Sequence, residues 1–127
     1  MLDNRSMPPS AVIPVLSCPD VVAESAWLRA AFGFLDRLAI GTHRVQLSYG
    51  SGSLVLASGP VAPATVMVRV EDADAHCAHA RAAGATILSE PADQPYGERQ
   101  YTALDPVGHT WTFSQTIADV DPAAWLT

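Results

Sequence analysis

The stretch PYGERQYTALDPVGHTWTFSQ, residues 95–115, holds Glu98, Asp105 and His109 within twelve positions. Two carboxylates and an imidazole could act as a general acid and base, or bind a metal ion. A DPVG turn explains Asp105 better, because Asp caps its own backbone there and Pro fixes φ. We therefore interpret Asp105 as structural, His109 as a satisfied or solvated side chain beside the turn, and Glu98 as a solvated charge.

A second cluster, HCAH, places His76 and His79 three residues apart on a predicted helix. Two imidazoles could share a metal ion, but the intervening Cys77 points about 100° away from its neighbour on a helix. No metal site is assigned here. The remaining sequence offers no nucleophile beside a base, no Gly-rich phosphate loop and no carboxylate pair on the predicted binding side, so no catalytic residue is predicted.

Charge and hydropathy exclude several classes of partner. The net charge is −6, from 13 acidic and 7 basic side chains, and the basic residues are scattered, so nucleic acid is not an expected partner. No apolar run approaches the ~18 residues of a membrane span, and the first residues lack the apolar core of a signal peptide. We expect a cytoplasmic protein that does not bind membranes.

The elements that must position these residues form a repeat. An extended run (12–20) ends at Asp20 before a helical pattern, and a second alternating run (65–72) ends at Asp72 before another. Each helix is followed by alternating runs that are broken by Gly-containing turns. The chain of 127 residues therefore predicts an α+β domain of two βαβββ modules, with a tail in which Trp125 packs back on the body; the predicted limits are about 11–58, about 65–115 and 116–127.

Alternation along the strands indicates which side chains face the helices. Val66 and Val68 are assigned to the helix side, so their neighbours face the opposite, binding side. The same test gives this set for the binding side: Arg44, Gln46, Val55, Met67, Arg69, Thr110 and Thr112. Applying the repeat, with a shift of 57 residues from the first module to the second, adds Arg99 and Tyr101 to the binding side. Tyr96 and Arg99 are predicted to form a polar pair at the mouth of the cavity. A packing Tyr and a surface Arg are the alternatives for that pair.

The motifs FGF (32–34), VEDADAHCAHARAAGATI (70–87) and YGERQYTALDPVGHTWTF (96–113) resemble the vicinal-oxygen-chelate superfamily, which includes glyoxalase I, extradiol dioxygenases and bleomycin-resistance proteins. The resemblance covers nearly the whole chain. It implies two modules that form a half-open mixed β-barrel with the helices outside, and modules of two chains that complete each other in a homodimer. Because the superfamily includes both enzymes and pure binders, the resemblance does not decide the function.

Metal-dependent members of the superfamily place one ligand on the first and last strand of each module. By register, those positions hold Ile13, Val55, Thr65 and Thr112, which lack imidazole, carboxylate and thiolate donors. The sequence therefore predicts a protein without metal or cofactor, of the bleomycin-resistance type, which sequesters an aromatic or heterocyclic molecule in a cavity at a dimer interface. The alternatives are a metal-dependent lyase, isomerase or dioxygenase acting on a 2-oxo or enediol-type substrate, and a structural or regulatory dimer without a ligand.

Overall fold

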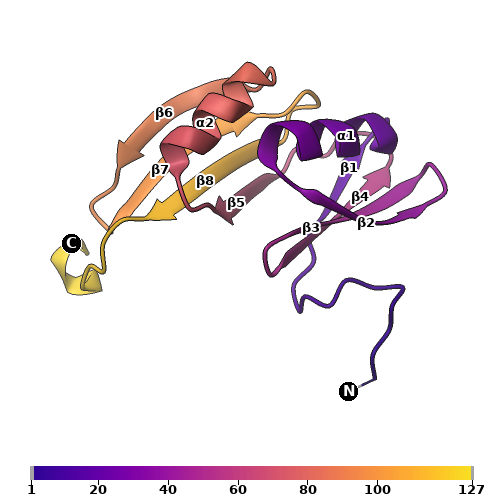
Figure 1. The fold of residues 1–127 in the computed structure, drawn as a ribbon, viewed down its shortest axis with the longest axis horizontal. Coiled ribbons are helices and arrows are strands. Elements are labelled where there is room, and N and C mark those ends of the chain that lie inside the picture. Colours follow the sequence, from indigo (N-terminus) through magenta and orange to yellow (C-terminus); the bar gives the residue numbers. More distant parts are fainter. Residues whose placement is uncertain (1, 127) are drawn as a thin grey trace. The chain divides into compact units, whose positions relative to one another are not determined.

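The computed structural model describes residues 2–126 and contains both predicted modules (Figure 1). The first consists of β1 (Val15–Cys18), α1 (Val21–Phe32), β2 (Leu35–Ile40), β3 (Arg44–Tyr49) and β4 (Gly52–Ser58). The second consists of β5 (Thr65–Arg69), α2 (Ala73–Ala82), β6 (Thr86–Asp93), β7 (Glu98–Leu104) and β8 (Thr110–Thr116), and a 3-10 turn, η1 (Pro122–Ala124), follows it. The α+β fold with two βαβββ modules is confirmed. The chain divides into two compact units, Met1–Ala62 and Pro63–Thr127, with one module in each.

The first unit packs α1 on one face of an open four-stranded sheet. The strand order is β1-β4-β3-β2, with β1 parallel to β4 and the other neighbours antiparallel. α1 begins at Asp20, whose carboxylate accepts a hydrogen bond from the N–H of Ala23 at 3.0 Å, and it ends at Gly33 with φ of 88°. The buried core of this unit includes Val21, Leu28, Phe32, Val45, Leu47, Leu54 and Leu56.

The second unit repeats this arrangement with α2 on the sheet β5-β8-β7-β6. Asp72 caps α2 by accepting a hydrogen bond from the N–H of Ala75 at 3.0 Å, as Asp20 does for α1. The buried core contains Val70, Ala73, Cys77, Ala80, Tyr101, Ala103, Trp111 and Phe113. In residues 2–126, neither helix is long and apolar enough to cross a membrane.

Each sheet also has a face turned away from its helix, which we call the helix-distal face. Directly paired residues share a face of a sheet, and side chains alternate between faces along each strand. Val15, Gln46 and Val55 are paired in one row of the first sheet, and this row is helix-distal because Leu47 and Leu54 of the next row belong to the core. The same reasoning defines the helix-distal face of the second sheet.

The C-terminal tail packs on the second unit through Trp125. Its ring lies 5.1 Å from that of Tyr96, centroid to centroid. The carbonyl of Gly97 accepts hydrogen bonds from the N–H groups of Ile117 and Ala118, at 2.9 and 3.2 Å. The predicted packing of Trp125 is confirmed.

Candidate functional site

Asp105 organises the turn between β7 and β8. Its Oδ1 accepts hydrogen bonds from the N–H groups of Val107, Gly108 and His109 at 3.0–3.1 Å, and its Oδ2 accepts one from the indole of Trp111 at 3.0 Å. The residue is 5% exposed. The Asp105 carboxylate therefore stabilises the turn between β7 and β8, as the turn motif indicates.

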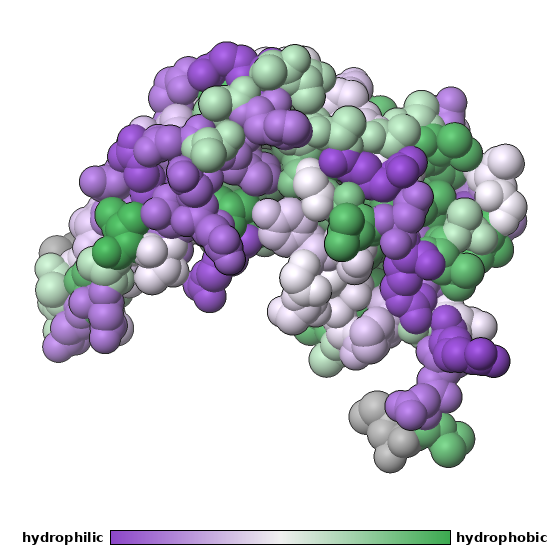
Figure 2. All heavy atoms as spheres, viewed as in Figure 1, coloured by the Kyte–Doolittle hydropathy of each residue, from purple (hydrophilic) through white to green (hydrophobic). Residues whose placement is uncertain are grey.

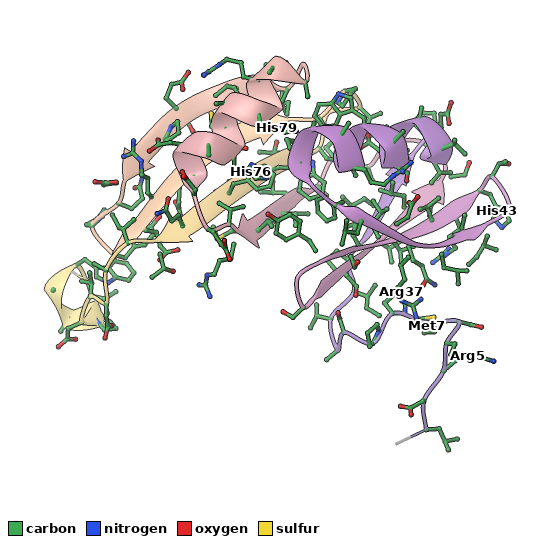
Figure 3. All side chains as sticks on the ribbon, viewed as in Figure 1. Arg5, Met7, Arg37, His43, His76 and His79 are labelled. Carbon is green, nitrogen blue, oxygen red and sulfur yellow. The ribbon has the colours of Figure 1, made fainter. Side chains whose placement is uncertain are left out.

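His109 and His76 are also bound within the second unit. His109 is buried, and its Nδ1 accepts a hydrogen bond from the N–H of Ala64 at 3.1 Å. His76 is hydrogen-bonded through Nδ1 to the hydroxyl of Tyr101, and its ring lies 4.3 Å from that of Phe113. His76 and His79 both lie on α2, where Figure 3 labels them. In residues 2–126, no three His, Cys, Asp or Glu side chains are grouped so that they could hold a metal ion.

On the first sheet, the helix-distal face carries Arg44, Gln46 and Val55, as the alternation predicts. Gln46 is only 3% exposed although it faces away from the helix. Its Oε1 accepts a hydrogen bond from Arg37 of β2, and its Nε2 donates to the carbonyl of Ser6 at 2.8 Å. Both ends of the side-chain amide are thus occupied by groups of the protein itself.

The cover over Gln46 is an N-terminal segment, residues 5–10, that crosses the helix-distal face of the first sheet. Arg37 holds this segment through a hydrogen bond of 3.1 Å to the carbonyl of Arg5, and Figure 3 labels both residues. Ser10 anchors its other end, with its hydroxyl 2.7 Å from the carbonyl of Ser51 and 2.6 Å from the hydroxyl of Ser53. On the visible surface in Figure 2, hydrophilic and hydrophobic patches lie next to each other around this segment.

The prediction that Tyr101 and Arg99 face the binding side is wrong. Tyr101 is fully buried against α2, pairs with Phe113 across the sheet and stacks on its ring at 5.1 Å. Arg99 lies on the same face and forms ion pairs with Asp74 of α2 at 3.0 Å and Asp93 of β6 at 2.9 Å. The hydrogen bonds that Arg99 donates to these two carboxylates raise its pKa.

The length of one turn explains this error. In the first hairpin, Ser48 pairs with Ser53, so four residues separate the partners; in the second, Leu104 pairs with Thr110, with five between them. A constant shift of 57 residues matches β4 to β8, but β3 matches β7 with a shift of one residue less. A one-residue change in register inverts the two faces of a strand.

On the second sheet, the helix-distal face carries Met67, Arg69, Thr110 and Thr112 as predicted, and the corrected register adds residues of β7. Among these are Glu98, interpreted from the sequence as a solvated charge, and Gln100 and Thr102, which the sequence analysis did not select. The alternation of Tyr101 and Ala103, read within β7 alone, was the signal that could have found them, since two apolar residues at period two mark the core face.

A chain of hydrogen bonds connects these newly placed side chains. The Tyr96 hydroxyl donates to Oε1 of Gln100 at 2.9 Å, and Nε2 of Gln100 donates to the hydroxyl of Ser114 at 3.0 Å. The Ser114 hydroxyl donates to Oε1 of Glu98 at 2.7 Å. Tyr96 therefore packs on Trp125 and also holds the Gln100 side chain through its hydroxyl. Nearby, the hydroxyls of Thr102 and Thr112 lie 3.2 Å apart.

Glu98 carries the negative charge of this face. Hydrogen bonds from Ser114 and then Thr116 lower the pKa of the Glu98 carboxyl below its ordinary value, and the positive charge of Arg69 acts in the same direction. Glu98 is half-buried. The side chain is therefore a stable carboxylate at neutral pH, and the interpretation of Glu98 as a simple solvated charge is incomplete.

The residues at the four metal-ligand positions do not fit a divalent cation. Val55, Thr65 and Thr112 are helix-distal in their sheets, and Ile13 precedes β1. Two hydrocarbon side chains and two neutral hydroxyls offer none of the imidazole, carboxylate or thiolate donors that such ions require. No metal-assisted step is therefore expected at these positions.

Comparison with known proteins gives a match over most of the chain. A family model described as the Glyoxalase/Bleomycin resistance protein/Dioxygenase superfamily matches residues 15–113. The solved structure of TioX from Micromonospora sp. ML1 is similar, with 32% sequence identity, a TM-score of 0.73, and coverage of 84% of this chain and 98% of that one.

More distant comparisons concern the fold or a part of the chain. A lactoylglutathione lyase structure from Agrobacterium tumefaciens shares 20% identity and a TM-score of 0.70 over 86% of this chain and 96% of that one, which shows a likeness of fold alone. The uncharacterized protein Mb0911c of Mycobacterium bovis is 37% identical over 59 residues. These are 46% of this chain and 39% of that protein, so the match spans less than half of either.

Proposed function

The chain belongs to the Glyoxalase/Bleomycin resistance protein/Dioxygenase superfamily, and from this premise we propose that it is a metal-independent protein that binds and sequesters a small molecule. The observation that carries the proposal is the chemistry of the four metal-ligand positions, Ile13, Val55, Thr65 and Thr112. Their methyl and hydroxyl groups suit contact with an organic ligand better than coordination of a cation. Binding, rather than turnover, is the function that these residues support.

The expected ligand is an aromatic or heterocyclic molecule. Val15 and Met67, both helix-distal, are 54% and 63% exposed. Exposed apolar side chains on a sheet face otherwise rich in hydroxyl and amide groups offer contact area to a flat ring together with hydrogen bonds to its edge. The wrongly placed Tyr101 has no part in this proposal, and Gln46 is excluded because its amide is already occupied.

We also propose that the protein is a two-fold homodimer whose ligand sites lie at the interface. Each sheet is open, with edge strands β1 and β2 in the first and β5 and β6 in the second. Leu35 and Leu88, on the edge strands β2 and β6, are 65% and 53% exposed. Exposed apolar residues on sheet edges favour association, and a second copy of the chain would cover them. Light scattering at micromolar concentration should give the mass of two chains, and the mass of one would refute the dimer.

Metal independence is tested with the purified protein. After incubation with excess zinc, nickel or manganese and desalting, the protein is expected to retain well under one ion per chain, and a chelator should leave the Tm unchanged. One tightly held ion per chain would refute the proposal.

Ligand binding is tested by calorimetric titration with a panel of aromatic acids and heterocycles. For each binder, Met67→Ala is expected to weaken binding by about 1–2 kcal/mol, because the substitution removes an apolar contact. Val22→Ala is the matched control, since Val22 is an exposed apolar residue too, at 53%, but lies on α1. Equal losses in the two variants would show that binding occurs elsewhere, and the absence of any binder would contradict the function.

A further inference from the structure

The hydrogen bonds across the second sheet run in one direction. The hydrogens of Tyr96, Gln100 and Ser114 are each donated to the next member of the chain, and the last acceptor is the Glu98 carboxylate. A carboxylate has no hydrogen to donate. The free end of the chain can therefore only accept a hydrogen bond.

The Glu98 carboxylate can accept a further hydrogen bond. An ionised carboxylate offers about four acceptor positions, and the hydroxyls of Ser114 and Thr116 use two of them. Both hydroxyls belong to β8, the neighbour of β7 in the sheet. The side chain is only half-buried, so the remaining positions can be reached by a molecule lying on the helix-distal face.

Arg69 provides hydrogen-bond donors on the same face. It pairs with Ser114 across β5 and β8, and it is exposed. Arg81 and Arg99 of this unit form ion pairs with acidic residues, whereas Arg69 forms none within residues 2–126. Its guanidinium therefore has hydrogens available for a carbonyl or another acceptor.

The spacing of these groups suits a small planar molecule. Arg69 and Glu98 belong to β5 and β7, which flank β8, so their backbones lie about 10 Å apart. Two long side chains that converge over β8 can reach adjacent atoms of one ring system. Met67, two residues before Arg69 on the same face, provides a polarizable apolar contact for the ring plane.

We propose that this face is a subsite for a heterocycle with a lactam or imide edge, whose N–H donates to Glu98 and whose carbonyl accepts from Arg69. The inference rests on the proposed small-molecule-binding function and names the chemical class of the ligand. An acceptor-only carboxylate would meet the negative charge of Glu98, and a donor-only ammonium would meet the positive charge of Arg69. The lactam edge satisfies both groups at once.

The test uses isoindolin-1-one and its N-methyl derivative, which differ by the single N–H, with quinoline as an aromatic reference. Titration of the full chain, followed by backbone amide NMR shifts, should show the parent lactam binding at β7 and β8 at least about 10-fold more tightly than the N-methyl compound. Glu98→Gln should remove most of that preference. Arg69→Met should weaken both lactams by the same factor and leave the preference in place.

Glu90→Gln is the matched control, because it removes the same charge from an exposed residue of β6 that is paired with Arg81. It should leave both affinities unchanged. If the N-methyl lactam binds as tightly as the parent, or if Glu98→Gln weakens both equally, the subsite is refuted. Binding of quinoline without either lactam also refutes the subsite but leaves the proposed function standing, whereas binding of none of the three overturns both.

Discussion

Replacement of Asp105 by Ala tests whether this carboxylate belongs to the fold or to a reaction. The substitution removes both acceptor oxygens, so the N–H groups of Val107 and His109 and the Trp111 indole lose their acceptor, while Gly108 keeps its 3.2 Å bond to the main-chain carbonyl of residue 105. Val107 is half-buried and can bind water instead. His109 and the Trp111 indole are buried and cannot.

The expected cost follows from those two buried donors. Leaving a buried donor unsatisfied costs about 1–3 kcal/mol, and the lost bonds were to a charged acceptor. We therefore expect Asp105→Ala to lower the free energy of unfolding by about 3–5 kcal/mol. For a chain of this length, that loss corresponds to a drop in Tm of roughly 10–20 °C.

Urea denaturation followed by tryptophan fluorescence measures this difference. Asp105→Asn should fall between wild type and Asp105→Ala, because it retains Oδ1 but turns an amide N–H toward the Trp111 indole. Asp72→Ala is the matched control: it also removes a carboxylate that caps a backbone N–H group, but at an exposed site, and should cost about 1 kcal/mol. If Asp105→Ala costs no more than Asp72→Ala, the structural role assigned to Asp105 is refuted.

Three further predictions concern the same sheets. Gly97→Ala should cost about 2–4 kcal/mol in chemical denaturation, because φ is +85° and an added Cβ would lie 2.4 Å from the Ala118 carbonyl; Gly50→Ala, with positive φ but open space, should cost less. The stability difference between wild type and Glu98→Gln should be largest near neutral pH and disappear as the pH falls below about 4.5 through the lowered pKa of Glu98; a pH-independent difference would contradict this. Deleting residues 2–9 should accelerate hydrogen exchange of the Gln46 side-chain amide, and unchanged exchange would refute the cover described above.

Local chemistry predicted the elements well because each signal acts within a few residues. Asp20 and Asp72 each precede a helical pattern in the sequence, and in the structure both cap the helices that follow. Alternation within one strand also placed Met67 and Arg69 correctly. Such signals need no knowledge of distant contacts, since capping and alternation are properties of adjacent residues.

The assignment of side chains to the two sheet faces was wrong where it was transferred from the first module to the second. A single extra residue in the second hairpin turn moved Tyr101 from the expected binding side to the core and brought Glu98 to the helix-distal face. Burial of Gln46 was also unpredictable, because the group that covers it lies 40 residues earlier in the chain. Long-range contacts of this kind leave no periodic pattern in the sequence.

The anchoring of the N-terminal segment has a consequence for how relatives are recognised. Arg37 and Gln46 bind this segment through the main-chain carbonyls of Arg5 and Ser6, and every amino acid has such a carbonyl. A relative could therefore keep the same cover with unrelated residues at these positions, which lie before the family match that begins at residue 15 of this chain. The trace that sequences can carry is the Arg–Gln pair on β2 and β3, nine residues apart, because these two side chains bind each other and hold the segment.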